Sequence, residues 1–313
     1  MEKKILSVGL AVCDIAVAPV PDTLFTFDSI EVDKVQVHSG GDALNVAVNL
    51  SKLGVQVEVI CRIGNDMFGD LLIKNAINKK VDTKYMKRTS DGTAVAIVII
   101  DGNGERHFIY YGGGNNHFQA SDVTDEMLEQ AGFLYIGSMF GLPKLTEGLP
   151  SLLMRAKEKG LQTAVDLTGN PTHEHLPALE AVLPYIDYFM PSMEEATGLT
   201  GLSDPVLIIN KFLSHNCKCV IIKNGAKGVW LATPEKTEQI NAFQVQQVDA
   251  TGAGDAFVSG FLFGLQKNMD LSNCARLGCA TGAICVGSIG ATSATPTAEE
   301  LKNFLEKEGL KII

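Results

Sequence analysis

The sequence predicts an α/β fold in which a mainly parallel central sheet carries helices on both faces, with a small second β-sheet beside it. Apolar runs of strand length alternate with amphipathic helical stretches along most of the 313 residues. The strand-like runs are apolar at nearly every position, which is typical of parallel strands buried on both faces. No repeat, low-complexity tract or linker divides the chain, so we expect a single domain over residues 1–313.

The elements of the central sheet follow one another along the chain. Strands are expected where uninterrupted apolar runs occur, at 5–12, 55–61, 133–137, 162–166, 185–190, 219–223 and 228–232. Helices are expected where apolar residues recur every three or four positions, at 41–53, 68–78, 144–160, 177–183 and 205–214. The last third of the chain is expected to be mainly helical, at 254–266, 271–286 and 298–308.

Two stretches have a different period. Residues 30–38 read I-E-V-D-K-V-Q-V-H and alternate between apolar and polar except at Asp33 and Lys34. Residues 93–111 hold two more strands around D-G-N-G at 101–104, a strong hairpin turn. Because alternating strands have one wet face, we predict that segments 15–38 and 93–112 form a small β-lid over the substrate. The alternative is an antiparallel extension of the main sheet.

Composition restricts the classes of partner. The net charge of −10 argues against a surface for nucleic acid or anionic membranes. No run of about 18 apolar residues occurs, so no membrane span is expected. Seven cysteines form no C-x-x-C pair and lie in apolar surroundings, which predicts reduced core thiols in a cytoplasmic protein.

The most informative segment is 249–255, which reads D-A-T-G-A-G-D and opens an apolar helical pattern. Gly252, Ala253 and Gly254 leave their backbone N–H groups unshielded. At a helix N-terminus these groups meet the positive end of the helix dipole, and together they make an anion site. Asp255 follows directly, so its carboxylate suits the deprotonation of an alcohol beside a phosphoryl group. The alternative role of Asp255 is that of a helix cap.

A second set of polar residues comes from the N-terminal part of the chain. Asp14 follows the first predicted strand, and a carboxylate at that position faces the ligand crevice of an open α/β sheet. It can accept hydrogen bonds from neighbouring hydroxyl groups of a ligand. Gly40 and Gly41 allow close backbone approach, and Asn45 offers both a donor and an acceptor. Asp42 is expected either to cap the following helix or to contact the substrate.

Two motifs resemble those of a known family. D-A-T-G-A-G-D at 249–255 resembles the signature D-x-[ST]-G-A-G-D of the ribokinase-like (PfkB) carbohydrate kinases. S-G-G-D-A-L-N-V-A at 39–47 is similar to the G-G-x-x-x-N segment of the same family, and the two motifs lie 210 residues apart in the family's order. The resemblance covers 5–296. It implies a ribokinase-like fold and an ATP-dependent kinase that phosphorylates a hydroxyl group, expected to be primary, of a small carbohydrate.

The resemblance also implies a role for each matching residue. Asp255 would be the general base, and residues 252–254 would bind the charge on the transferred phosphoryl group. The residues expected to contact the acceptor are Asp14, Gly40, Gly41, Asn45 and Arg106. The residues expected to border the nucleotide are Ser192, Lys223, Gly225, Gly228, Thr251 and Cys279, with Gly282 and Ala283 near the adenine.

ATP and Mg²⁺ are the implied cofactors. Glu195, in P-S-M-E-E at 191–195, matches the glutamate of the family's N-x-x-E motif, which reaches magnesium through water. Ser192 stands where the family most often has asparagine, and its shorter side chain departs from the pattern. Asp249 and the segment 288–294 correspond to the loop that binds a monovalent cation such as K⁺ in some relatives. The lid pairs two chains in relatives, so a homodimer is a further expectation.

Other functions compete with this interpretation. A nucleoside kinase of the same fold would need an apolar platform for a base, for which Phe108, Tyr110 and Phe118 are candidates. A sugar-phosphate kinase would want several cations, and the predicted lid strands offer only Lys34 and Arg106. A non-catalytic sensor of sugar or nucleotide would not require the anion site that this chain retains. A Rossmann dehydrogenase is disfavoured because no G-x-G-x-x-G follows the first strand.

Overall fold

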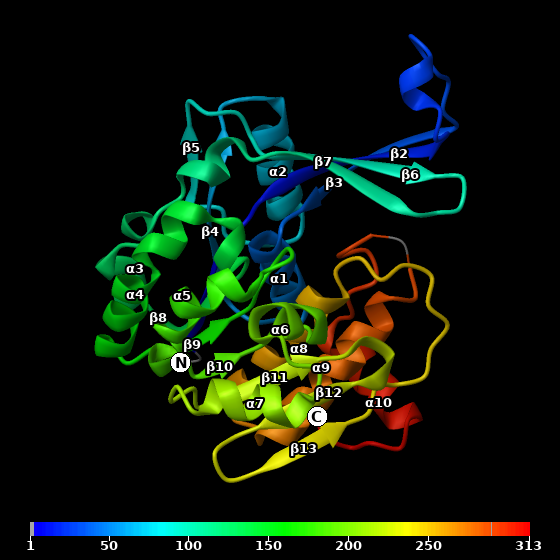
Figure 1. The fold of residues 1–313 in the computed structure, drawn as a ribbon. Helices are drawn as coiled ribbons and strands as arrows, with labels where there is room; N and C mark the ends of the chain where they lie inside the picture. The colour runs from blue at the N-terminus through cyan, green and yellow to red at the C-terminus, as the bar shows by residue number, and fades with distance from the viewer. Residues whose placement is uncertain (1–2, 289) are drawn as a thin grey trace.

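The chain forms a large central β-sheet and a small second sheet that projects from it (Figure 1). A computed structural model describes residues 3–288 and 290–313. The predicted fold class, a mainly parallel sheet with helices on both faces and a second small sheet, is confirmed.

The central sheet has the strand order β13-β12-β11-β10-β9-β8-β1-β4-β5. The strands from β11 to β5 are parallel to one another, whereas β12 and β13 add an antiparallel edge. The strands are β1 (Lys4–Val8), β4 (Val57–Gly64), β5 (Met86–Thr89), β8 (Ala131–Ile136), β9 (Gln162–Val165), β10 (Tyr188–Phe189), β11 (Cys219–Lys223), β12 (Val229–Ala232) and β13 (Thr237–Ile240).

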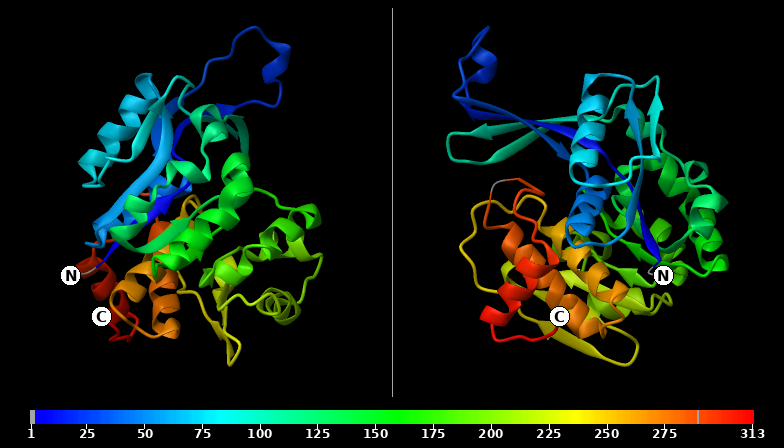
Figure 2. Two further views of the ribbon diagram at one scale, coloured as in Figure 1. Left: turned by 90° about the vertical axis from the view of Figure 1, so that its left-hand side faces the viewer. Right: turned by 180° about the vertical axis from the view of Figure 1, so that it is seen from behind.

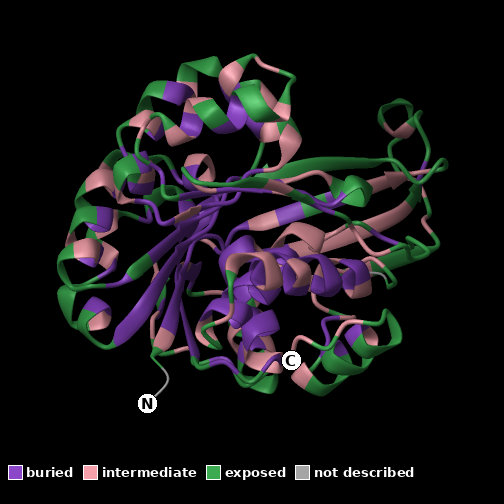
Figure 3. Cartoon of the chain, turned by 90° about the horizontal axis from the view of Figure 1, so that it is seen from below, coloured by how far each residue is buried: buried purple, intermediate pink, exposed green. Residues whose placement is uncertain are grey.

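Helices cover both faces of this sheet and create two hydrophobic cores. Ile5 and Leu6 of β1 point into different cores, as the period of a strand requires. The strands between the two layers are almost entirely buried (Figure 3). One core is covered by α1 (Asp42–Lys52), α2 (Met67–Asn78), α8 (Ala253–Gln266), α9 (Leu271–Cys285) and α10 (Ala298–Lys307). The other is covered by α3 (Asp125–Glu129), α4 (Pro143–Glu158), α5 (Leu176–Glu180), α6 (Met193–Thr200) and α7 (Pro205–Leu213).

The second sheet projects from the rest of the molecule (Figure 2) and has the strand order β3-β2-β6-β7. Its two faces carry different residues. Its strands are β2 (Val12–Val20), β3 (Lys34–Gly40), β6 (Val95–Asp101) and β7 (Arg106–Tyr111). Directly paired residues share a face of a sheet. One row across the sheet consists of His38, Asp14, Ala96 and Tyr110. The next row, on the opposite face, consists of Val37, Ile15, Ile97 and Ile109.

The first predicted strand, 5–12, is wrong in its extent. The chain leaves the central sheet after Val8 and becomes extended again at Val12, where β2 begins. Asp14 therefore lies inside β2 and not just beyond the first strand. Continuous apolar character hid this change, because β1 and the start of β2 are both buried and differ only in their pairing partners.

Several short elements were not predicted, among them β5, β13 and α3. Each of these three has five residues or fewer, which is too short for a hydrophobic period to be distinctive. A helix beginning within 191–195 is confirmed by α6. The other predicted core strands and the long helices are confirmed with shifts of a few residues at their ends. The seven cysteines are buried and free of disulfides. Among the helices described, none combines the length and apolar character needed to cross a bilayer.

Candidate active site

Residues 252–254, here called the anion-binding turn, lie where α8 begins. Gly252 precedes the helix with a φ of 77°, a conformation that favours glycine, and a Cβ at this position would lie 2.6 Å from Ala291 Cα. A Cβ placed on Gly254 would lie 3.6 Å from Lys223 Nζ. A helix N-terminus and an ammonium group therefore border the same small region. Both favour a bound anion.

Asp255 follows in the first turn of α8. Its Oδ2 accepts a hydrogen bond of 2.8 Å from Asn45 Nδ2 on α1. Burial raises the pKa of Asp255 to about 7, and the negative charges of Asp166 and Asp14 act in the same direction. The Asn45 hydrogen bond and the charge of Lys223 oppose that rise in pKa. A carboxylate that titrates near neutral pH is suited to accept a proton from an alcohol.

Lys223, the last residue of β11, makes a buried ion pair with Asp166, which follows β9. Its Nζ lies 2.7 and 2.6 Å from the two carboxylate oxygens. Burial raises the pKa of Asp166 to about 6, although the lysine charge opposes this. Burial acts to lower the pKa of Lys223, but Asp166 and other nearby carboxylates outweigh it and raise the pKa, so the ammonium is charged at neutral pH. Asp166 was not predicted as a site residue, although its position directly after a parallel strand is the signal used for Asp14.

A cleft of about 470 Å³ opens beside the anion-binding turn. Its volume lies within the usual range for small-molecule sites, about 300–1,000 Å³. Residues from β11, α6, α8, α9 and the segment 242–247 form its walls. The predicted site residues that line it are Ser192, Glu195, Lys223, Gly225, Gly228, Gly252, Ala253, Gly254, Asp255 and Cys279, together with Gly282 and Ala283. The site residues predicted from the sequence thus come from four separate segments, which the fold brings together around one cavity.

Ser192 and Glu195 bond to each other's backbone at the start of α6. Ser192 Oγ accepts from Glu195 N at 3.1 Å, and Glu195 Oε2 accepts from Ser192 N at 2.7 Å. This reciprocal pair is a capping box, which explains why serine is well suited to position 192. The S-x-x-E pattern at 192–195 is the sequence signature of such a box. Both residues also line the cleft.

Gly40 and Gly41, two of the residues expected at the acceptor, border Asp14 and the segment that precedes β2. A Cβ on Gly40 would lie 2.0 Å from Asp14 Oδ2, so a side chain at this position would displace the carboxylate. Gly41 has a φ of 89°, and a Cβ there would lie 2.4 Å from the Leu10 carbonyl oxygen. Burial raises the pKa of Asp14 to about 6.

Asp42 is the first residue of α1 and is buried. It is not the N-cap residue, which is Gly41, although its Oδ1 accepts the first-turn N–H of Ala43. Its carboxylate also accepts from Leu10 N at 3.0 Å, from Thr168 Oγ1 at 3.3 Å and from Ser138 Oγ. Asp42 therefore connects the chain segments that follow β1, β8 and β9. The sequence did not point to Ser138 or Thr168, which are joined to Asp42 only by the fold.

Asn115 and Tyr110 supply further polar groups near Asp14. Asn115 Nδ2 donates to the Ala11 carbonyl and to Tyr110 Oη, each at 3.2 Å. Asn115 Oδ1 is buried and has no hydrogen-bond partner among the described residues. Burial raises the pKa of Tyr110, and the charges of Asp42 and Asp14 add to the rise. The unpaired carbonyl of Asn115 is the type of group that a ligand hydroxyl can satisfy.

Arg106 contacts Asp249. The first was expected at the acceptor and the second at a monovalent cation. Arg106 donates to Asp249 Oδ1 at 2.7 Å and also to Thr251 Oγ1. Thr251 is turned toward Asp249, which accepts from its backbone N–H and its hydroxyl. Gly290 N donates to Asp249 Oδ2 at 3.0 Å. The expected cation segment 288–294 includes residue 289, which lies outside the described residues.

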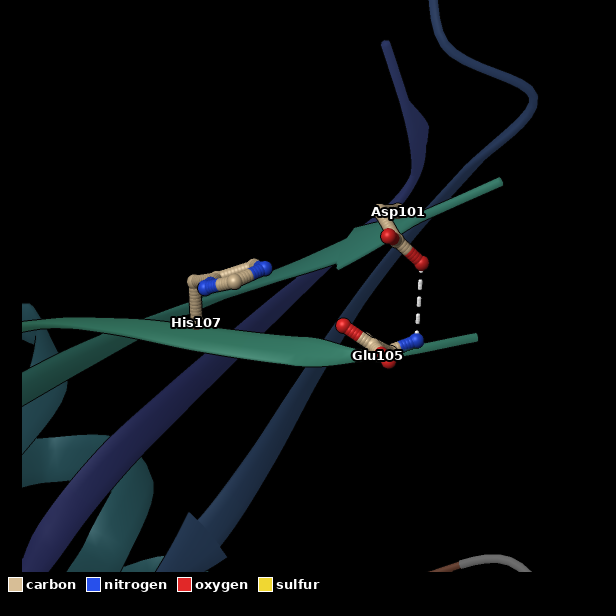
Figure 4. Close-up of side chains that lie close together, drawn as sticks. All are labelled: Asp101, Glu105 and His107. Atoms are coloured by element: carbon tan, nitrogen blue, oxygen red, sulfur yellow. Dashed lines mark hydrogen bonds between the residues drawn. The ribbon is translucent and has the colours of Figure 1, made fainter. Parts of the chain in front are cut away.

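Three side chains of the kinds that can bind a metal ion lie close together at the far end of the β6–β7 hairpin (Figure 4). It consists of Asp101, Glu105 and His107. Asp101 Oδ1 accepts the backbone N–H groups of Asn103 and Glu105 at 2.8 Å each. These bonds close the predicted hairpin turn, and they account for Asp101 as a turn residue.

The chain is similar to known carbohydrate kinases over nearly its whole length. A model of the pfkB family carbohydrate kinases matches residues 2–298. Ribokinase from Haemophilus influenzae is 30% identical over 280 residues, 87% of this chain and 88% of that protein. The ATP-dependent 6-phosphofructokinase of Thermoanaerobacterium thermosaccharolyticum is 25% identical over 290 residues, 91% and 90% of the two chains. The crystal structure of fructokinase with bound ATP from Xylella fastidiosa has a TM-score of 0.86 at 26% identity and covers 99% of this chain and 100% of that one. The chain therefore belongs to the PfkB family of carbohydrate kinases.

Proposed function

We propose that this protein transfers the γ-phosphoryl group of ATP to a primary hydroxyl group of a small carbohydrate. The observation that carries the proposal is the position of Asp255, which titrates near neutral pH directly beside the anion-binding turn and the cleft. Relatives named ribokinase, fructokinase and 6-phosphofructokinase support the same class of reaction.

The cleft has the features that ATP requires. Lys223 and the anion-binding turn offer positive charge and N–H donors for phosphate oxygens, and the small residues of α9 leave room for the base. Glu195 lines the cleft with hard carboxylate oxygens, so it fits a magnesium ion that keeps most of its waters. Magnesium, when bound, neutralises charge on the phosphate oxygens.

The transfer itself follows from Asp255. Its carboxylate takes the proton of the acceptor hydroxyl while that oxygen forms a bond to the γ-phosphorus, and the bond from phosphorus to the leaving oxygen of ADP breaks. The N–H groups of the anion-binding turn stabilise the charge on the transferred group, a contribution worth about 10²–10³ in rate for each donor. Asp14 and Asn45 hold the acceptor, and Asn45 also orients Asp255 through its 2.8 Å hydrogen bond.

The second sheet acts as a lid over the acceptor and joins two copies of the chain. The face that carries Asp14 and Tyr110 would cover the substrate. The opposite face carries Val37, Ile97 and Ile109, which are 48%, 36% and 54% exposed. A contiguous apolar face of this kind favours burial against a second copy. We expect a dimer in sedimentation equilibrium, and Ile97→Lys should convert it to a monomer; a wild-type monomer at micromolar concentration would contradict the dimer.

A nucleoside kinase is the second candidate. Phe108 is 64% and Tyr110 is 49% exposed, and both lie on the face of the second sheet that carries Asp14. These rings can form part of a platform for a base. Phe118, the third candidate for that platform, is 1% exposed and belongs to the core.

The decisive experiment is release of ADP measured with ATP, Mg²⁺ and a panel of free sugars, sugar acids, sugar phosphates and nucleosides, with Asp255→Asn as the blank. Turnover of a carbohydrate that is abolished in the variant would support the proposal and identify the acceptor. Turnover of nucleosides alone would establish the second candidate. No turnover of any acceptor, with ATP binding retained in calorimetry, would refute the proposal and favour a non-catalytic sensor.

A further inference from the structure

Arg106, the first residue of β7, connects the second sheet to the motif at 249–255. Its guanidinium donates to Asp249 Oδ1 at 2.7 Å and to Thr251 Oγ1. In Figures 1 and 2 the β6–β7 hairpin lies over the loop that precedes α8. The positive charge at Asp249 thus comes from a segment 143 residues away in the chain.

The contacts of Asp249 occupy the hydrogen-bonding capacity of its carboxylate. Its side chain is only 4% exposed. Oδ1 accepts from Thr251 N at 2.8 Å, Thr251 Oγ1 at 2.7 Å and Arg106, and Oδ2 accepts from Gly290 N at 3.0 Å. The carboxylate therefore has four donors for the roughly four acceptor positions that a carboxylate offers.

This arrangement does not fit a monovalent cation at Asp249, the site that the family resemblance implies. A cation would need carboxylate oxygens that the donors already occupy, and it would bring a second positive charge beside the guanidinium. Arginine forms such buried pairs well because it is always charged and weakly hydrated. Asp249 thus has its counter-charge from the protein itself.

The same contacts fix the anion-binding turn. Thr251 is held by its backbone N–H and its hydroxyl, and the next residue is Gly252, which begins the turn. Arg106 contacts both Thr251 and Asp249, so from the side of the second sheet it holds two of the three residues that precede the turn.

We propose that Arg106 is the built-in counter-cation of Asp249 and a positioning residue for the anion-binding turn, so that this kinase does not require a monovalent cation. The inference rests on the proposed kinase function, because part of its test is a rate. Its other part is a thermal midpoint, which needs no substrate.

The test compares wild type with Arg106→Ala, Arg106→Lys and the matched control Lys34→Ala, which removes an exposed lysine from β3 of the same sheet. Each protein is assayed in choline chloride, sodium chloride and potassium chloride at constant ionic strength. The measurements are kcat, KM for ATP and for the acceptor, and the midpoint of thermal unfolding without substrates.

Wild type and Lys34→Ala should keep the same kcat within about twofold in all three salts. Arg106→Ala should lose at least about tenfold in kcat in choline chloride, because a charged donor to a buried group is removed. Potassium should restore part of that rate and raise the unfolding midpoint of this variant alone. Arg106→Lys should keep most of the rate, since it retains a charge that can reach Asp249.

Two results would overturn the inference. One is a wild-type enzyme that loses its activity in choline chloride. The other is an Arg106→Ala variant whose kcat and midpoint do not respond to potassium; a raised KM for the acceptor alone would then assign Arg106 to the substrate. If wild type phosphorylates nothing in any salt, the proposed function fails, whereas the midpoint of Arg106→Ala in potassium still decides the question of the counter-cation.

Discussion

The side-chain amide of Asn45 donates a hydrogen bond of 2.8 Å to Asp255, although 210 residues separate the two in the chain. Asn45 belongs to the N-terminal motif and Asp255 to the C-terminal one. The bond stabilises the ionised carboxylate and therefore acts to lower the pKa of Asp255. Burial has the larger and opposite effect, and it raises the pKa to about 7. The protonation state of this residue therefore changes close to neutral pH.

We expect kcat/KM to increase with pH through about 7 and to level off above it, because the base must be ionised to accept a proton. Asn45→Ala removes a hydrogen bond to the ionised form, so the pKa of Asp255 should rise and the acidic limb should move to higher pH. The measurement is the pH profile of kcat/KM, with Asn78→Ala at the exposed end of α2 as the control. A limb that stays in place in Asn45→Ala would refute this assignment of the bond.

Asp255→Asn should lower kcat at least about 10²-fold, because it removes the base, with little change in acceptor affinity. The matched control is Asp270→Asn, since Asp270 caps α9 by accepting from Asn273 N. If Asp255 were only a helix residue, the two variants would behave alike, with a lower unfolding midpoint and an unchanged kcat. Steady-state kinetics and thermal unfolding of both variants separate these roles.

The sequence predicted what depends on local pattern. Buried parallel strands are recognisable in the sequence as apolar runs. The anion-binding turn is recognisable because small residues at a helix start leave the backbone N–H groups open to an anion. The strand with which a segment pairs can lie far away in the sequence. The sequence therefore did not predict that the chain leaves the central sheet after β1 and enters the second sheet as β2.

The same limit applies to the site. Asp166 is an ordinary acidic residue in the sequence, and it becomes distinctive only through Lys223, which comes from another strand. The bond between Asp42 and Ser138 likewise joins segments that lie 96 residues apart in the chain. Arg106 was expected at the acceptor because it lies in the predicted lid. Its contact with Asp249 depends on how far the hairpin extends over α8, which residue spacing does not encode.

Lys223→Met should lower the free energy of unfolding by about 3–5 kcal/mol, because it leaves the buried Asp166 carboxylate without its partner. Lys223→Met combined with Asp166→Asn removes that charge and should recover part of the loss. Both variants should keep a raised KM for ATP, since the ammonium group beside the anion-binding turn is absent. The control Lys236→Met breaks an exposed ion pair with Glu238 and should change the unfolding free energy by less than about 1 kcal/mol.

Urea unfolding and ATP kinetics measure these effects. Recovery of the ATP KM in the double variant would show that Lys223 stabilises the fold and does not contact phosphate. An unchanged unfolding free energy in Lys223→Met would contradict the buried ion pair.

Two glycines near the contact of α8 and α9 are expected to have different roles, one in leaving space for the nucleotide and one in the packing of the two helices. Substitutions at the two positions should separate these roles. A Cβ on Gly282 would meet only the Ala253 carbonyl oxygen, at 3.5 Å, and Gly282 lines the cleft. Gly282→Leu should therefore fill the cleft and raise the KM for ATP at least about tenfold, with little change in the unfolding midpoint. A Cβ on Gly260 would lie 2.3 Å from Thr281 Oγ1, between the two helices.

Gly260→Ala should consequently lower the free energy of unfolding by about 1–3 kcal/mol through overpacking and leave the KM for ATP near that of wild type. Calorimetric titration with ATP and thermal unfolding of the two variants provide the comparison. If Gly282→Leu binds ATP as tightly as wild type, the nucleotide base does not occupy the α9 side of the cleft. If Gly282→Leu unfolds as early as Gly260→Ala, the glycine at 282 is required for packing and not for the ligand.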